Sequence, residues 1–476
     1  RRQTSRRRIE ALFFRDQYGL EVIVPTLRPI LPWLVLLDDG IRERVSRLAP
    51  EVFFEGGDPS QLPLTTRRAV LHAVCRRIAT GGFRQSVGDY DAVQRFALPD
   101  LADDIARLID TYPDNEDILW ILLRMVWQGQ LGTALPQALA VAHNPTAPKY
   151  VRIAAFRAVA AVGTPDDMIG VRRAFAVEPG KLRRDWLAEL ISGAPRTVDS
   201  VDWLLICLAK LAARDPHGSD EIDEAVTRFV EDAEPSVLVH LLQTARPLLS
   251  EPPVIERRHC EVSERFVWFL KPLAAAAAGL ARERHPAAME PPALHVFHNL
   301  PAASDYGRVD PDGLKVDLQA VLADWPELKI ALLWHAVARA REELAADNGE
   351  PLTDIWPVLV YTPILRFEPQ DFDRVLTEAQ TRPVLDDRRV ALSLAFRLYV
   401  AGGRLRAWRT RLHRVAAADP ECTAQLKALL RPPPMPARHR RFNRMSRRWD
   451  RRNAARDARL AEDRRKSRDY LAANID

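Results

Sequence analysis

Apolar residues recur at helical spacing along almost the whole chain, and this pattern restricts the fold more than any other feature of the sequence. In a helix, residues three or four positions apart share a face. One such face is predicted over 117–128, where the inward residues are Ile118, Leu122, Met125 and Val126. Similar helices are predicted over 150–162, with Arg152 and Arg157 outside the buried stripe, and over 181–191. Alternating, strand-like runs are scarce, so the pattern predicts an all-α fold.

The predicted helices also repeat at a regular interval. They begin near residues 117, 150 and 182, roughly 32 to 33 residues apart, and a second helix lies in each interval, over 132–142 and 166–176. Turn sequences separate them, such as TPDD at 164–167, in which the threonine caps a helix and the acidic residues favour its N-terminal dipole. Helix pairs of this size bury their apolar faces by stacking on their neighbours, which predicts an α-solenoid.

Changes in composition divide the chain into five predicted parts. They are a helical lead-in over 1–45, helical repeats over 46–250, a proline-rich irregular connection over 251–311, a second helical module over 312–430 and a basic, helical tail over 431–476. The tail follows the sequence LLRPPPMPAR at 429–438, whose prolines end the preceding fold.

The net charge of +5 is unevenly distributed. Residues 1–8 contain five arginines, and residues 438–476 contain fourteen Lys or Arg against six Asp or Glu, so the segment between them is acidic. With 47% apolar and 28% charged residues, the composition is typical of a soluble globular protein. The longest apolar stretches, over 30–37 and 273–281, fall well short of the roughly 20 residues that span a bilayer. No membrane-spanning helix is therefore expected.

The cysteines lie far apart and form no CxxC pair; they are Cys75, Cys207, Cys260 and Cys422. This arrangement predicts reduced, buried or half-buried thiols in a cytoplasmic protein. Cys260 follows Arg257-Arg258-His259, and because neighbouring cations lower the pKa of a thiol, a reactive thiol is the alternative at that position.

Motifs for catalysis, nucleotide binding and metal binding are not found. A P-loop requires GxxxxGK followed by Ser or Thr, whereas Gly180-Lys181 is followed by Leu182. His295 and His298 form one close pair, but a zinc site needs two further ligands, and a histidine pair in a loop is the simpler interpretation. There is no GxSxG sequence. We therefore predict no catalytic residue, no cofactor and no metal in this segment.

The basic tail contains the only candidate contact residues. They are Arg440, Arg441, Phe442, Arg444, Arg447, Arg448, Trp449, Arg451 and Arg452, with Met445 completing an apolar seam at helical spacing. Arginines that follow a phosphate backbone and aromatic rings that stack on bases are typical of a nucleic-acid-binding helix. Two alternatives stay open: the seam docks onto this protein or a partner, or the tail is a solvated helix with ion pairs along its surface.

A resemblance to a known family comes from residues 27–82. They contain, in order, LRP, WL, IRER, PE and GGDPSQLP, followed by a basic helix. This order resembles the region that follows the ATPase core in large bacterial NACHT-type proteins of the STAND NTPase class. The matching residues are Leu27, Arg28, Pro29, Trp33, Leu34, Ile41 to Arg44, Pro50, Glu51, Gly56 to Ser60, Leu62 and Pro63. The sequences at 122–131, 144–167 and 182–191 are similar to the HEAT-like repeats of such proteins.

This resemblance implies a role without transferring any catalytic residue. It implies a sensor or regulatory segment that binds a protein or other ligand, controls an ATPase core upstream and acts in antiphage defence, with assembly into an oligomer on activation. The absence of an initiator Met at Arg1 leads us to expect such an upstream core. The alternatives are a free-standing HEAT-like scaffold that binds protein partners, and a solenoid whose arginine-rich tail binds nucleic acid.

Overall fold

The computed structural model describes residues 6–81, 90–213, 221–257, 260–304, 318–347, 349, 351–362, 364–431 and parts of 445–466. The chain forms two compact units, Arg1–Ala336 and Val337–Asp476. The first unit therefore extends past the predicted boundary at 311, and helix α19 (Pro326–Asp347) crosses from one unit to the other.

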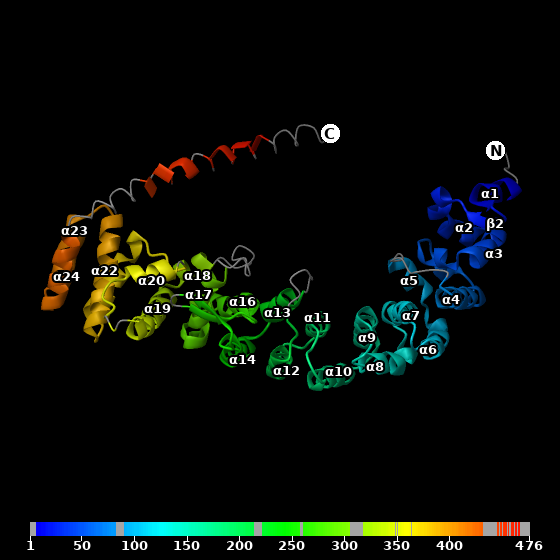
Figure 1. Ribbon diagram of the computed structural model, residues 1–476, viewed down its shortest axis with the longest axis horizontal. Coiled ribbons are helices and arrows are strands. Elements are labelled where there is room, and N and C mark those ends of the chain that lie inside the picture. The colour runs from blue at the N-terminus through cyan, green and yellow to red at the C-terminus, as the bar shows by residue number, and fades with distance from the viewer. Residues whose placement is uncertain are drawn as a thin grey trace. The chain divides into compact units, whose positions relative to one another are not determined.

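The first unit begins with a mixed lead-in and continues with helices (Figure 1). The α-helices and strands of its first half are α1 (Arg6–Phe13), β1 (Phe14–Gln17), β2 (Leu20–Ile23), α2 (Leu31–Leu37), α3 (Asp39–Leu48), α4 (Leu64–Ala79), α5 (Tyr90–Phe96), α6 (Ala102–Thr111), α7 (Glu116–Gly129), α8 (Leu135–Ala142) and α9 (Lys149–Val162). Those of its second half are α10 (Pro165–Val177), α11 (Arg184–Ser192), α12 (Val198–Ala209), α13 (Ile222–Glu231), α14 (Pro235–Thr244), α15 (Arg246–Leu249), β3 (Val254–Arg257), β4 (Cys260–Ser263), α16 (Leu270–Arg282), α17 (Pro291–Ser304) and α18 (Leu318–Asp324).

The second unit is helical in its described residues. After α19 come α20 (Trp356–Tyr361), α21 (Phe372–Thr381), α22 (Leu385–Ala401), α23 (Arg406–Ala416) and α24 (Pro420–Leu430). Short 3₁₀ helices lie between the α-helices of both units: η1 (Pro25–Ile30), η2 (Pro50–Phe54), η3 (Pro59–Gln61), η4 (Pro99–Leu101), η5 (Gly132–Ala134), η6 (Val267–Phe269), η7 (Pro286–Met289) and η8 (Pro369–Asp371). The predicted all-α fold is confirmed, whereas the solenoid arrangement stays a prediction.

The middle of the first unit has two rows of helices, visible in Figure 1. In the first row, α7 contacts α9, α9 contacts α11, and α11 contacts α13. We call it the groove row because a surface groove crosses these four helices. In the second row, α8 contacts α10, α10 contacts α12, and α12 contacts α14. Each helix of the groove row is thus followed in sequence by a helix of the second row, as the predicted helix pairs require.

The predicted helix faces are the buried faces. Ile118, Leu122, Met125 and Val126 of α7 are fully buried, so their removal from water favours the folded state by about 1.5–3 kcal/mol for each side chain. At the start of α10, Thr164 accepts a hydrogen bond from the Asp167 amide, and Asp167 accepts one from the Thr164 amide. This capping box, with Pro165 at the first helical position, fixes the turn that the sequence predicts.

The helical lead-in predicted over 1–45 is wrong in one part, because β1 and β2 form an antiparallel hairpin. Tyr18 and Gly19 lie at its turn with φ of 55° and 77°. Two consecutive positive φ values suit a two-residue hairpin turn, and Gly19 also donates its amide to Asp16 Oδ1 at 3.0 Å. A second hairpin, β3 with β4, lies over 254–263. Four-residue strands are too short for an alternating apolar pattern to reveal them.

The irregular connection predicted over 251–311 is also wrong in large part. It contains α16 and α17, and ten of the thirteen residues of α16 are buried. Four of the eight prolines of this region lie in the first turn of a helix, where a missing backbone amide costs nothing: Pro272 in α16, Pro286 in η7, and Pro291 and Pro292 in α17. Half of the proline content that predicted a loop therefore marks helix starts.

The motif residues that carry the family resemblance hold the lead-in together. Arg28 bonds Glu55 through Nη2 and Oε1 at 2.6 Å and Glu51 through Nη2 and Oε1 at 3.1 Å. The hydrogen bonds that Arg28 donates to the Glu55 carboxylate raise the pKa of Arg28, and burial of the side chain opposes this shift without cancelling it. Gly57 packs its backbone against Pro32: a Cβ there would lie 2.4 Å from the Pro32 carbonyl oxygen. These motif residues thus make structural contacts.

Among the helices of the described ranges, none combines the length and the apolar character that crossing a bilayer requires.

Candidate functional site

The groove row presents three connected hollows along its surface. The first lies between α7 and α9 and measures about 280 Å³; the second reaches from α9 over α11 to α13 and measures about 220 Å³; the third lies between α11 and α13 and measures about 340 Å³. Tyr150, Ile153 and Arg157 line both the first and the second, and Ser192 and Arg228 line both the second and the third. The three hollows therefore form one groove across four helices.

Aromatic and guanidinium groups dominate the first hollow. The Arg124 guanidinium lies 5.4 Å from the centre of the Trp120 ring, and that of Arg157 lies 5.1 Å from the centre of the Trp127 ring. Tyr150 completes the wall with 59% of its surface exposed. Trp, Tyr and Arg are the residue types on which binding energy concentrates at protein interfaces.

Ion pairs join neighbouring helices along the groove. Arg157 of α9 donates to both carboxylate oxygens of Glu189 on α11, at 2.8 and 2.7 Å. Lys149 Nζ lies 2.9 Å from Asp185 Oδ2 on α11, and Arg183 Nη2 lies at the same distance from that oxygen. Burial opposes ionisation of Asp185, but the hydrogen bonds from Arg183 and Lys149 outweigh it and lower the pKa of this carboxyl. The charged wall is thereby held in one arrangement.

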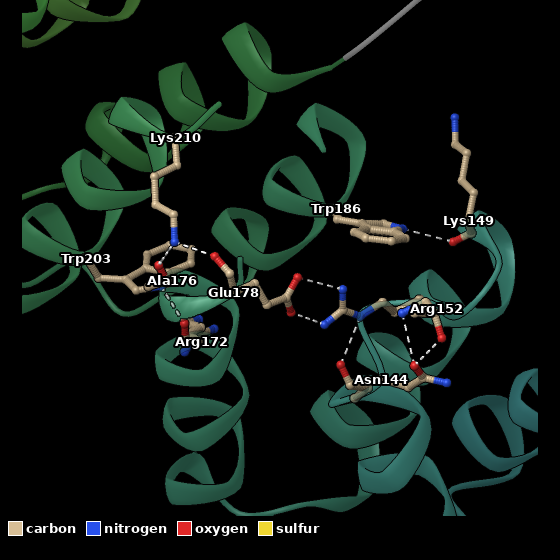
Figure 2. A network of polar contacts seen from close by, with 11 residues as sticks. Asn144, Lys149, Arg152, Arg172, Ala176, Glu178, Trp186, Trp203 and Lys210 are labelled. Atoms are coloured by element: carbon tan, nitrogen blue, oxygen red, sulfur yellow. Dashed lines mark hydrogen bonds and ion pairs between the residues drawn. The ribbon is translucent and has the colours of Figure 1, made fainter. Parts of the chain in front are cut away.

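A buried network supports the groove from behind (Figure 2). The structure corrects the prediction that Arg152 lies outside the buried stripe of α9: its side chain is 1% exposed and forms an ion pair with Glu178, which follows α10. Arg152 Nη1 donates to Glu178 Oε2 at 3.1 Å, and Arg152 Nε donates to the Ala142 carbonyl at 3.0 Å. Its guanidinium also lies 4.6 Å from the centre of the Trp186 ring. Arg152 is stable in the core because its guanidinium contacts the Glu178 carboxylate, the Ala142 carbonyl and the Trp186 ring.

Side chains also reach backbone carbonyls of the preceding helix pair. Trp186 Nε1 donates to the Lys149 carbonyl at 3.2 Å, and Trp203 Nε1 donates to the Arg172 carbonyl at 2.7 Å (Figure 2). Lys210 Nζ donates to the carbonyl of Ala176 at 2.9 Å and to that of Glu178. Ala176 lies in the last turn of α10, so Lys210 satisfies a carbonyl that has no partner within its own helix. The two tryptophans instead bond carbonyls in the first turn of α9 and inside α10.

The side-chain contacts that join one helix pair to the next have similar sequence separations. The separation is 31 residues for Trp203 and Arg172, 32 for Arg157 and Glu189, and 37 for Trp186 and Lys149. These values bracket the predicted repeat of roughly 32 to 33 residues. Each link thus joins a helix pair to the next one along the chain.

Of the nine contact residues predicted in the tail, five fall outside the residues that the structure describes: Arg440, Arg441, Phe442, Arg444 and Arg447. The remaining ones are helical and exposed: Arg448, Trp449, Arg451 and Arg452. Met445 and Trp449 are each 65% exposed, so the described part of the apolar seam is not covered by the protein itself.

The two histidines of the sequence motif lie on a helix, which corrects the interpretation of a loop pair. His295 and His298 belong to α17, and His298 is 2% exposed. His335 of α19 packs against both rings, with centroids 6.2 Å from His295 and 5.7 Å from His298. Across the described part of the chain, no group of three His, Cys, Asp or Glu side chains is arranged to hold a metal ion.

Three of the four cysteines are buried free thiols, as the sequence predicts: Cys75, Cys207 and Cys422. Burial raises the pKa of Cys75 and of Cys207 to about 12, so both thiols stay protonated at neutral pH. The side chain of Cys260, the alternative reactive thiol, lies outside the described residues.

Sequence reasoning missed the groove. Trp120, Arg124 and Trp127 are spaced by four and three residues on α7, so they share a face, on which the two tryptophans are half-buried and Arg124 is buried. Large aromatic residues away from the apolar stripe were the available signal. Arg157 was placed off the stripe correctly, but its link to Glu189 depends on how the helices stack.

Comparison with protein-family models, with curated proteins and with solved structures finds no match to this chain. The groove and the residues that line it are therefore the features from which a function can be inferred.

Proposed function

We propose that this chain is a non-catalytic helical-repeat segment that recognises a protein ligand and controls the ATPase core of a cytoplasmic, NACHT-type STAND protein in bacterial antiphage defence. The observation that carries the recognition part is the groove across α7, α9, α11 and α13. Its Tyr150 side chain is exposed, its Trp120 and Trp127 side chains are half-buried, and Arg157 is held against the Trp127 ring by its ion pair with Glu189 of α11. Side chains that are already ordered lose little conformational entropy on binding, so such a wall suits specific recognition.

The charges of the groove favour a protein over a nucleic acid. Acidic residues line the second and third hollows, among them Asp185, Glu189 and Asp232. A phosphate backbone carries a negative charge at every nucleotide and is attracted by uniformly basic surfaces. A surface of alternating sign is instead typical of protein interfaces, where it fixes register and partner choice.

The link to a STAND protein is supported by the resemblance over residues 27–82. Arg28, Glu51 and Gly57 of that stretch make structural contacts, which agrees with a motif that shapes the lead-in to helical repeats. The repeated separation of 31 to 37 residues between linked side chains supports HEAT-like stacking in the same way.

The experiment tests the groove in the full-length product of the gene, with phage plating and ATP hydrolysis as readouts. The variant Tyr150→Ala/Arg228→Glu changes two exposed groove side chains, and we expect it to reduce protection at least about tenfold, the loss of roughly 1.4 kcal/mol of binding. ATP hydrolysis in the presence of phage lysate is expected to fall with it.

The matched control is Ile206→Ala/Arg173→Glu, which changes an exposed apolar and an exposed basic residue on α12 and α10 of the second row. It should behave as wild type. Equal protection by the groove variant and wild type would overturn the assignment of the groove. A natural upstream sequence without Walker A and B motifs would overturn the NTPase part alone, and would favour a free-standing scaffold.

The exposed tail residues Arg448, Trp449, Arg451 and Arg452 favour nucleic-acid binding as a second candidate function. Because our proposal assigns recognition to the groove, we expect the full chain and a chain lacking residues 438–476 to bind RNA and DNA equally weakly. Affinity is measured at two salt concentrations. A salt-dependent loss of affinity on removal of the tail would instead establish it as a nucleic-acid-binding arm, since phosphate contacts weaken steeply with salt.

A further inference from the structure

We propose that the groove takes an extended peptide segment whose large apolar side chain enters the first hollow and whose acidic side chain pairs with Arg228. This inference rests on the proposed function and narrows it to one class of ligand. It follows from two features of the groove: a hollow walled by aromatic rings at α7 and α9, and an accessible cation at α13.

The first hollow suits an apolar anchor. Trp120, Trp127, Tyr150 and Ile153 supply most of its wall, and no acidic residue lines it. Its volume of about 280 Å³ is enough for the side chain of Leu, Phe or Trp. The Arg157 guanidinium already lies against the Trp127 ring and is bonded to Glu189, so it closes the wall and leaves the space for an uncharged group.

Arg228 is the basic side chain of the second hollow that has no ion-pair partner among the described residues, although Glu231 and Asp232 line the third hollow beside it. It is exposed on α13 and lines both the second and the third hollow. By contrast, Asp185 and Glu189 in the second hollow are paired with Lys149 and Arg157. A ligand carboxylate therefore gains more from Arg228 than from any other basic side chain of the second hollow.

Glu221, an acidic residue of the second hollow, disfavours a second carboxylate on the ligand. Glu221 lies at the start of α13, seven residues before Arg228, which is about 10 Å along the helix axis. It disfavours acidic side chains at its own end of α13 and so restricts the ligand to one acidic position.

The helix spacing sets the distance between the two ligand residues. Packed helices lie about 8–10 Å apart, and Arg228 is about two helices beyond the first hollow. An extended chain advances about 3.3 Å per residue, so about six residues separate the apolar anchor from the acidic residue. The connected hollows between them accept the intervening backbone.

A display experiment on the chain itself tests this ligand class. Yeast displaying random twelve-residue peptides is sorted against the labelled 476-residue protein, and the enriched sequences are aligned. We expect Leu, Phe or Trp at one position and Asp or Glu about six residues away. With Arg228→Glu, the acidic preference should change to Lys or Arg at the same position. With Tyr150→Ala, affinity for the selected peptides should fall at least tenfold.

Two controls keep the outcome interpretable. Arg173→Glu and Ile206→Ala, both on the second row, should leave the selected sequences unchanged, and circular dichroism verifies the fold of every variant. Selection of no common motif, or an acidic preference that survives Arg228→Glu, overturns the proposed ligand. Because no ATPase is involved, such a failure leaves the phage-protection result of the groove variant untouched, and the two proposals can fail separately.

Discussion

Replacing Arg152 with alanine is expected to lower the free energy of unfolding of the first unit by about 3–5 kcal/mol, the usual cost of removing one partner of a buried ion pair. The substitution leaves the Glu178 carboxylate, which is 12% exposed, without its countercharge. It also removes the hydrogen bond to the Ala142 carbonyl and the contacts of the guanidinium with the Trp186 and Phe156 rings, at 4.6 and 5.3 Å. Urea unfolding followed by circular dichroism measures the effect, and hydrogen exchange locates it in α9 and α11.

Arg157→Ala is the matched control for that experiment. It also removes an ion pair of α9, in this case with Glu189 of α11, but the Arg157 side chain is 39% exposed, so the expected loss is about 1 kcal/mol or less. A loss of similar size for Arg152→Ala and Arg157→Ala would show that the buried pair contributes no more than a surface pair, contrary to this expectation.

Replacing Gly57 with alanine is expected to destabilise the first unit by about 2–5 kcal/mol. Gly57 has φ of +71°, a conformation that costs a residue with a Cβ about 1–2 kcal/mol. The new Cβ would also lie 2.4 Å from the Pro32 carbonyl oxygen, so the backbone of α2 has to move, and such overpacking costs about 1–3 kcal/mol more. Thermal and urea unfolding measure the sum.

Gly81→Ala separates the two contributions. Gly81 has φ of +72°, but a Cβ there meets no atom within 4 Å. This control should therefore lose only the conformational part, about 1–2 kcal/mol. If Gly57→Ala costs no more than Gly81→Ala, the contact with Pro32 does not restrict position 57, and the structural explanation of the GGDPS sequence is wrong.

Local sequence predicted what depends on local contacts. The apolar spacing of Ile118, Leu122 and Met125 identified the buried face of α7, and the TPDD sequence identified the cap of α10 through Thr164 and Asp167. In both cases the interacting residues lie within one or two helical turns of each other. The sequence pattern alone is then sufficient.

Contacts between distant residues escaped prediction. Arg152 read as a surface residue because its partner Glu178 lies 26 residues away and is brought to it by the packing of α9 against α10. The groove escaped for the same reason, since Tyr150 and Arg228 line one surface only after α9, α11 and α13 stack. The β1–β2 hairpin escaped because its strands have four residues each.

The links between successive helix pairs have a mechanical consequence. Each of them, such as Trp203 with Arg172, connects only nearest neighbours, so a strain introduced at one pair passes to the next through a small number of contacts. The three hollows cross four helices of this series. A molecule that fills all three would fix the spacing of these helices and make the groove row less flexible. Ligand binding would then be transmitted along the chain as a loss of flexibility, without any change of fold.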